Sequence, residues 1–134
     1  MAVDPDQHLK LNSSEDVVLV RQAVRQMTSV LGFSLVDQTK IVTAASELAR
    51  NTVTYGGGGS ARVELIKAQG RSGVRVTFED SGPGIANIDQ AMKDGFTSGG
   101  GLGLGLGGAK RLTDEFGIDS SPGQGTRVWI VRWR

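Results

Sequence analysis

A glycine-rich segment from Thr97 to Ala109, with the sequence TSGGGLGLGLGGA, carries the strongest chemical signal in the chain. Seven of its thirteen residues are glycine, which lets backbone N–H groups approach a ligand without a Cβ in the way. A helix that begins directly after such a loop presents free N–H donors and a positive dipole end to an anion. We therefore expect this segment to lie against a phosphate chain.

Two other interpretations of this segment stay open. Gly103, Gly105 and Gly108 satisfy the G-x-G-x-x-G fingerprint of dinucleotide-binding folds, but that fingerprint directly follows a strand, whereas turn-like residues precede this one. A flexible hinge without a ligand is the second alternative, and it leaves the interleaved leucines without a role.

Three further clusters hold polar side chains that could do chemistry. Glu47 and Asn51 are four residues apart and therefore share one face of a predicted helix. Asp80 ends an apolar segment and opens an Asp-Ser-Gly-Pro-Gly turn, and Thr126 follows a Gly-Gln-Gly turn. Taken singly, a solvated helix face, an ordinary turn and a hairpin loop would account for these residues.

Together with the glycine-rich segment, these clusters supply each part of a site for ATP and magnesium. The Asn51 amide oxygen suits magnesium, which takes one or two protein oxygens and completes its shell with phosphates and water. Glu47, one turn earlier, is placed to accept a proton from an attacking hydroxyl. Asp80 suits the exocyclic amine of adenine, and Thr126 completes that contact directly or through water.

Hydrophobic spacing predicts the elements that must position these residues. Apolar residues at steps of three and four indicate helices, and alternating apolar residues indicate strands. The expected elements are strand 7–11, helices 14–31 and 34–54, strands 60–68 and 73–79, helices 87–93 and 104–116, and strands 118–121 and 126–133. This order predicts an α/β two-layer sandwich, with a mixed, mainly antiparallel sheet and helices on one face. The last strand is apolar on both alternations and should lie inside the sheet.

Composition excludes several classes of function. The 134 residues suit a single domain over 1–134, and a formal net charge of +1 predicts no nucleic-acid partner. The absence of cysteine and the single histidine, His8, argue against a disulfide framework and a zinc site. No apolar run reaches the roughly 18 residues of a membrane span, so we expect a cytoplasmic protein with no membrane partner.

The four clusters, E-x-x-x-N, D-x-G-x-G, G-L-G-L-G and G-x-G-T in that order, resemble the N, G1, G2 and G3 boxes of the GHKL ATPases. From about residue 10 onward, the chain is similar to bacterial anti-sigma serine/threonine kinases, and most of all to switch-protein kinases of the RsbT type. The phrases that carry this likeness are SELARN at 46–51, EDSGPGI at 79–85, DGF at 94–96, KRL at 110–112 and DEF at 114–116.

The resemblance implies a role for each matching position. Asn51 would bind magnesium, Glu47 would be the catalytic base, and Asp80 would bind adenine. Gly82 and Gly84 would shape the adenine pocket. The residues that would wrap the phosphates are Gly101, Leu102, Gly103, Gly105 and Gly107.

The resemblance also implies partners. Kinases of this kind phosphorylate a serine or threonine on a STAS-domain antagonist protein, and RsbT-type members also activate a PP2C-type phosphatase. An anti-sigma factor that sequesters a sigma factor is the alternative, and an accessory ATPase of the DNA-repair or chaperone kind is a third possibility. The segment between Lys93 and Lys110 carries no lysine or arginine, so the group that neutralises the γ-phosphate besides magnesium stays open.

Overall fold

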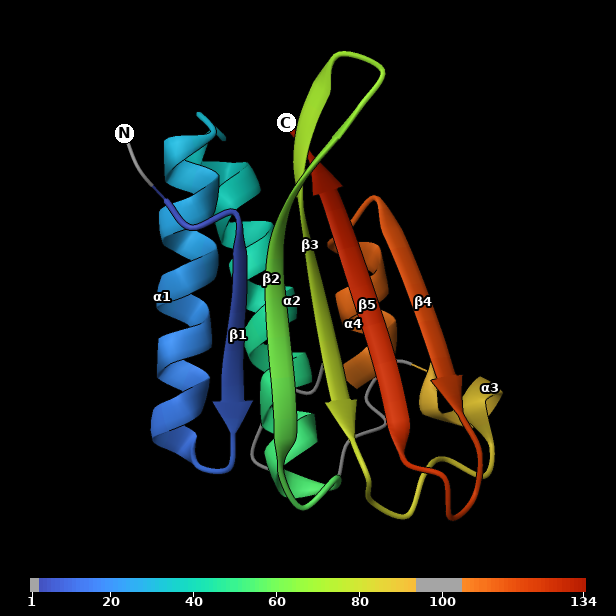
Figure 1. Cartoon of the computed structure of the whole chain (residues 1–134). Coiled ribbons are helices and arrows are strands. Elements are labelled where there is room, and N and C mark those ends of the chain that lie inside the picture. Colours follow the sequence, from blue (N-terminus) through green and yellow to red (C-terminus); the bar gives the residue numbers. More distant parts are fainter. Residues whose placement is uncertain (1–2, 94–104) are drawn as a thin grey trace.

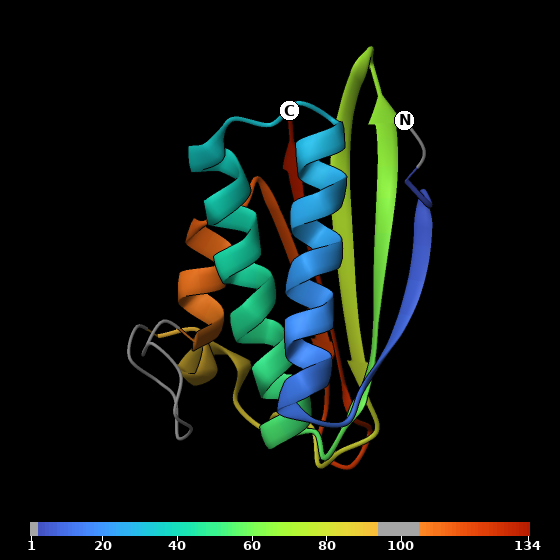
Figure 2. The ribbon, with the colours of Figure 1, turned by 90° about the vertical axis from the view of Figure 1, so that its left-hand side faces the viewer.

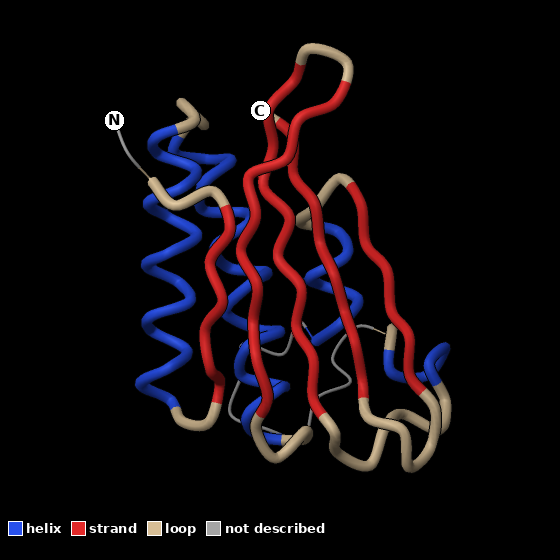
Figure 3. The backbone as a smooth tube through the Cα atoms, viewed as in Figure 1, coloured by secondary structure: helices blue, strands red, loops and turns tan. Residues whose placement is uncertain are grey.

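A five-stranded antiparallel sheet forms one layer of the protein, and helices cover one of its faces (Figures 1 and 3). The computed structural model describes residues 3–93 and 105–134. The described strands are β1 (Asp6–Leu11), β2 (Gly59–Ala68), β3 (Arg71–Asp80), β4 (Glu115–Ser120) and β5 (Thr126–Trp133). Their order in the sheet is β1-β2-β3-β5-β4, so β5 is interior, as its two apolar faces predicted.

The two long helices begin and end where the sequence predicted. They are α1 (Ser14–Val30) and α2 (Leu35–Thr54), and the hydroxyls of Ser13 and Ser34 cap their first turns by accepting backbone N–H bonds. Gly32, with φ of +83°, follows α1 in the left-handed conformation that glycine adopts at little cost. Two shorter helices, α3 (Ile88–Ala91) and α4 (Gly105–Arg111), complete the described set.

The hydrophobic core lies between the helices and the sheet. Figure 2 shows α1, α2 and α4 side by side over the strands, and α2 contacts both of the others. Fully buried side chains from both layers meet there. The larger of these are Leu11, Val20, Val24, Met27, Ile41, Leu48, Val63, Val74, Val76 and Ile130.

The predicted helix over 104–116 is wrong at its C-terminal end. Helix α4 ends at Arg111, and Phe116 lies in β4 instead. The hydroxyl of Thr113 donates to the carbonyl of Ala109, and the N–H of Asp114 donates to the carbonyl of Val131 on β5. The chain therefore leaves the helix within one turn because its backbone groups find partners on the neighbouring strand. Every described strand pair is antiparallel, so the sheet has no parallel component in this part of the chain.

The face of the sheet away from the helices carries arginine, acidic side chains and two tryptophans. Trp129 and Trp133 lie on it, each beneath an arginine: Arg127 at 5.0 Å from the ring of Trp129 and Arg71 at 5.7 Å from that of Trp133. Trp129 also covers Gly117 on β4, where a Cβ would collide with its ring. None of the described helices combines the length and the hydrophobicity needed to cross a bilayer.

Candidate functional site

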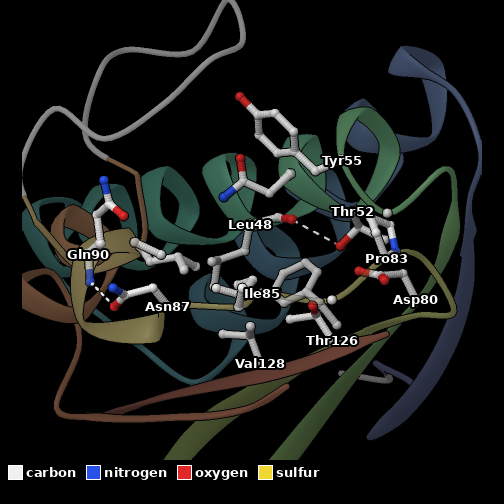
Figure 4. A pocket seen from close by; sticks show the side chains of 17 residues that line it. Leu48, Thr52, Tyr55, Asp80, Pro83, Ile85, Asn87, Gln90, Thr126 and Val128 are labelled. Carbon is white, nitrogen blue, oxygen red and sulfur yellow. Dashed lines mark hydrogen bonds between the residues drawn. The ribbon is translucent and has the colours of Figure 1, made fainter. Parts of the chain in front are cut away.

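A cavity of about 460 Å³ opens between the C-terminal half of α2 and the ends of β3 and β5 (Figure 4). Its size lies in the range of small-molecule sites. The apolar part of its wall consists of Leu48, Phe78, Pro83, Ile85, Ala86, Ala91, Leu106 and Val128. Asp80 is the one charged residue among the described residues that border the cavity. The part of the cavity beside Asp80 therefore suits a flat, largely apolar group with a hydrogen-bond donor.

Asp80 and Thr126 face each other at the end of the sheet. They are direct partners in the antiparallel register of β3 and β5, and both border the cavity (Figure 4). Side chains at such opposite positions lie close enough to act on one ligand group. The N–H of Gly82 donates to Oδ1 of Asp80 at 2.9 Å, which fixes the carboxylate in its turn. The two residues therefore lie together at one cavity, and their contact with adenine stays a prediction.

Glycines allow the backbone to close tightly around Asp80. A Cβ on Gly56 would collide with the Asp80 carboxyl group, and a Cβ on Gly125 would collide with its main-chain carbonyl. Gly84, with φ of +76°, packs against the carbonyl of Ser121. Gly82 in turn lies against the backbone of Gly56. Gly56, the first glycine after α2, therefore belongs to the site. The sequence did not assign it because only the tertiary contact reveals it.

A hydroxyl network ties the turn after β3 to the hairpin between β4 and β5. Oγ of Ser120 lies 2.9 Å from the N–H nitrogen of Ile85, 2.9 Å from the carbonyl oxygen of Gly125 and 2.9 Å from Oγ1 of Thr126. No motif in the sequence singled out Ser120, because a serine before a turn is common in proteins. The network holds Thr126 at the wall of the cavity.

Helix α2 brings the second pair of predicted residues to the same region. Asn51 borders the cavity, whereas Glu47, one turn earlier, is only 3% exposed and lies outside the described cavity wall. Nη1 of Arg50 lies 3.4 Å from Oε1 of Glu47. The last turn of α2 adds Tyr55 to the rim of the cavity. The roles of Glu47 and Asn51 toward a nucleotide stay predictions.

The glycine-rich segment is described only in part. Gly101, Leu102 and Gly103 lie outside the described residues, and so does the predicted phosphate loop that they form. Gly105 and Gly107 lie in the buried first turn of α4, and Leu106 between them borders the cavity. The described end of the segment therefore reaches the same cavity as Asn51, Asp80 and Thr126.

Two amide side chains line the cavity without having been predicted. Asn87 caps α3, since its Oδ1 accepts the N–H of Gln90 at 3.0 Å, and both residues border the cavity (Figure 4). The described residues contain no cluster of three or more His, Cys, Asp or Glu side chains that could hold a metal by themselves. A divalent ion at this site would need oxygens from its ligand as well.

Comparison with known sequences identifies relatives over nearly the whole chain. Residues 36–134 match the family described as histidine kinase-, DNA gyrase B- and HSP90-like ATPase. The serine/threonine-protein kinase RsbT of Bacillus subtilis is 44% identical over 125 residues, which cover 93% of this chain and 94% of that protein. The anti-sigma F factor of a Thermoanaerobacter species is 30% identical over 128 residues, which cover 92% of this chain and 89% of that protein.

Solved structures share the fold. The RsbU and RsbW domains of a Mycobacterium tuberculosis protein align with 99% of this chain at a TM-score of 0.68 and 22% identity, and the aligned part is 34% of that longer chain. The mycobacterial sensor histidine kinase MprB aligns with 95% of this chain at a TM-score of 0.55 and 19% identity. At these identities the likeness concerns the fold alone.

Proposed function

Because the chain belongs to the family of histidine kinase-, DNA gyrase B- and HSP90-like ATPases, we propose that it is an ATP-dependent kinase that phosphorylates serine or threonine on a regulatory protein. The activity named for the Bacillus relative extends to this chain because the likeness spans almost the full length of both proteins. The 30% identity to an anti-sigma F factor supports a role in regulation through a partner protein.

One observation carries the proposal: a single cavity is bordered by Asn51 on α2 and by Asp80 and Thr126 at the sheet end. The carboxylate of Asp80 accepts hydrogen bonds, which suits the 6-amino group of adenine, and the apolar wall suits the two faces of the ring. The described start of α4 reaches the same cavity through Leu106. This arrangement supports a bound ATP with its base at the sheet and its phosphates toward α2 and α4.

In the proposed reaction, the hydroxyl oxygen of the protein substrate forms a bond to the γ-phosphorus of ATP. The bond from that phosphorus to the β,γ-bridging oxygen breaks, and ADP leaves. Glu47 takes the proton of the hydroxyl, and its position one turn before Asn51 supports this role. Asn51 fits as the protein ligand of magnesium because its amide oxygen is a hard, neutral donor at the cavity wall. Magnesium, when bound, neutralises charge on the phosphates.

We propose that the protein substrate is a STAS-domain antagonist in the cytoplasm, and that the kinase also activates a PP2C-type phosphatase. The alternative is an anti-sigma factor that sequesters a sigma factor, and the 30% identity to anti-sigma F factors favours considering it. Affinity purification of the tagged chain from its native cells separates the two. Recovery of a sigma factor without a STAS protein or phosphatase would decide for the alternative.

The test of the reaction is incubation with γ-labelled ATP, magnesium and STAS proteins encoded near the gene. We expect label on serine or threonine of one of them. Glu47→Gln should bind ATP nearly as well as the parent and transfer phosphate about 10²-fold more slowly, because the amide cannot take the proton. Glu79→Gln is the matched control, since Glu79 is exposed on the outer sheet face and pairs with Arg127.

Two outcomes would count against the proposal. Absence of transfer to any STAS protein, despite tight ATP binding, would contradict the substrate class. Equal transfer rates for Glu47→Gln and the parent would remove Glu47 from the role of base.

A further inference from the structure

The hydroxyl of Ser120 has a fully occupied hydrogen-bond shell. Its Oγ lies 2.9 Å from three groups: the N–H of Ile85, the carbonyl of Gly125 and the hydroxyl of Thr126. A serine hydroxyl supplies one donor and two acceptor lone pairs. Three partners at hydrogen-bond distance therefore use its whole capacity.

Counting protons assigns a direction to each bond. The N–H of Ile85 can only donate, and the carbonyl of Gly125 can only accept. Ser120 therefore donates its single proton to the carbonyl of Gly125. Otherwise the lone pairs of these two oxygens would face each other at 2.9 Å. The remaining contact then requires Thr126 to donate its proton to Ser120. Thr126 is left with lone pairs alone for the cavity that it borders.

The neighbouring Asp80 carboxylate is likewise a hydrogen-bond acceptor without a donor. Asp80 is opposite Thr126 in the register of β3 and β5, and as an ionised group it only accepts hydrogen bonds. The sheet end therefore offers two acceptors and no donor from these two side chains. An exocyclic amine has two hydrogens to give, whereas a carbonyl at the same position would face two acceptors.

We infer that Ser120 is a positioning residue for base selection: it locks the Thr126 hydroxyl as an acceptor, so the site takes a 6-aminopurine nucleotide and rejects a 6-oxopurine. This inference rests on the proposed function, because it assigns the base end of the nucleotide to Asp80 and Thr126. Ser120 does not contact the base itself. It acts by accepting the proton of the Thr126 hydroxyl, which fixes the direction of that hydrogen bond.

The test compares ATP with inosine triphosphate, which carries a carbonyl where ATP carries the amine. Calorimetry on the magnesium complexes gives the ratio of the two dissociation constants. In Ser120→Ala the Thr126 hydroxyl is free to turn and donate to the carbonyl, so the preference for ATP should fall about 3- to 10-fold, the value of one hydrogen bond. Ser121→Ala, one residue further along, is the matched control and should keep the parent ratio.

A second set of variants separates this mechanism from a general loosening of the loops. Thr126→Val removes the hydroxyl, and in that background Ser120→Ala should change the ratio less than about 2-fold, because there is no longer a proton to redirect. Ser120→Cys keeps a side chain of similar size with a weaker donor and acceptor, and serves if the alanine variant does not fold. It should lower the preference for ATP in the same direction.

The outcomes are distinguishable. A parent protein that binds neither nucleotide would overturn the proposed function itself. Tight ATP binding with an unchanged ratio in Ser120→Ala and Ser120→Cys would overturn only the role of Ser120. An equal drop of the ratio in Ser120→Ala with and without Thr126 would also overturn it, because the effect would not pass through that hydroxyl.

Discussion

Among the described residues, glycines rather than a charged neighbour hold Asp80 in position. Gly82 donates its N–H to the carboxylate at 2.9 Å, and Gly56 leaves the space that the carboxyl group fills. Backbone donors and close packing hold the carboxylate still, so its acceptor direction toward the cavity is set before a ligand arrives. Such preorganisation lowers the cost of binding.

Replacing Gly56 by alanine tests this arrangement. The new Cβ would collide with the Asp80 carboxyl group, which must move away from its place at the cavity. We expect ATP affinity to fall about 10-fold or more while the protein still folds, as measured by calorimetry and thermal melting. Gly57→Ala is the control: nothing lies near its Cβ, and with φ of +73° the change should lower stability but leave ATP affinity unchanged.

Arg50 lies beside Glu47, the predicted catalytic base on α2. The Glu47 side chain is 4% exposed, and Nη1 of Arg50, whose side chain is 38% exposed, lies 3.4 Å from its Oε1. Removing the arginine would leave the buried Glu47 carboxylate with less positive charge beside it. We expect Arg50→Met to lower the rate of phosphotransfer about 10-fold or more with little change in KM for ATP, and Arg50→Lys to retain more activity. Arg21→Met, on the exposed face of α1, should behave as the parent; a loss of ATP binding in Arg50→Met would contradict a role through Glu47.

Between elements, Arg132 joins three parts of the fold. From β5 its guanidinium donates through Nη2 to Asp37 in the first turn of α2, at 2.6 Å, and through Nη1 to the carbonyl of Leu112 after α4, at 3.1 Å. The side chain is only 15% exposed. One arginine thus ties the start of α2 and the end of α4 to the same strand. This tie fixes the C-terminal end of α4 on the sheet.

The pair of Asp37 and Arg132 makes stability depend on pH. The hydrogen bond from Arg132 holds the pKa of Asp37 below its usual value of 3.8. Unfolding releases that carboxylate to a higher pKa, so the unfolded state binds more protons and stability rises with pH in this range. The contribution is present above 3.8 and is lost as the pH falls toward the lower folded-state value.

We therefore expect Asp37→Asn to lower the free energy of unfolding at pH 7, and the difference from the parent to narrow below pH 3.8. Urea unfolding at a series of pH values measures this. In an Arg132→Gln background the same substitution should add little pH dependence. A difference that stays constant from pH 7 downward would contradict the pairing.

Local patterns predicted those elements whose signals lie within the element itself. Helices α1 and α2 carry serine caps and apolar stripes, and their bounds were predicted closely. The end of α4 was not predicted correctly. Residues 112–116 are compatible with a helix by themselves, and only the bond from Asp114 to β5 shows that they leave it. Asn51, Asp80 and Thr126 border the cavity and were predicted from their motifs, while their roles stay predictions. Gly56 and Ser120 escaped prediction because they act through contacts between distant segments.

Across the whole molecule, the nucleotide cavity lies where the two layers meet. Asn51 and Tyr55 come from the helical layer, and Asp80, Thr126 and Val128 come from the sheet. A ligand in this cavity contacts both layers at once. It should therefore stabilise the packing of one layer on the other rather than a single loop.

Binding to the folded protein predicts a large thermal shift. With magnesium and ATP at 100 times the dissociation constant, linkage gives about 2.7 kcal/mol of added stability. For a domain of this size we expect the melting temperature to rise by about 10 °C, as followed by differential scanning calorimetry. Asp80→Asn should melt near the parent temperature without nucleotide and show little shift with it. An equal shift in both proteins would place the nucleotide elsewhere.

The position of the two tryptophans on the outer sheet face determines what intrinsic fluorescence can report. Both Trp129 and Trp133 lie under arginines on the side of the sheet opposite the helices. Among the described residues, the aromatic side chains at the cavity are those of Tyr55 and Phe78. Indole emission should therefore follow the melting of strands β3 to β5 but stay nearly silent when a nucleotide occupies the cavity. A quenching titration that reports no change is thus the expected behaviour of a protein that binds well, and a labelled or fluorescent nucleotide has to supply the optical signal.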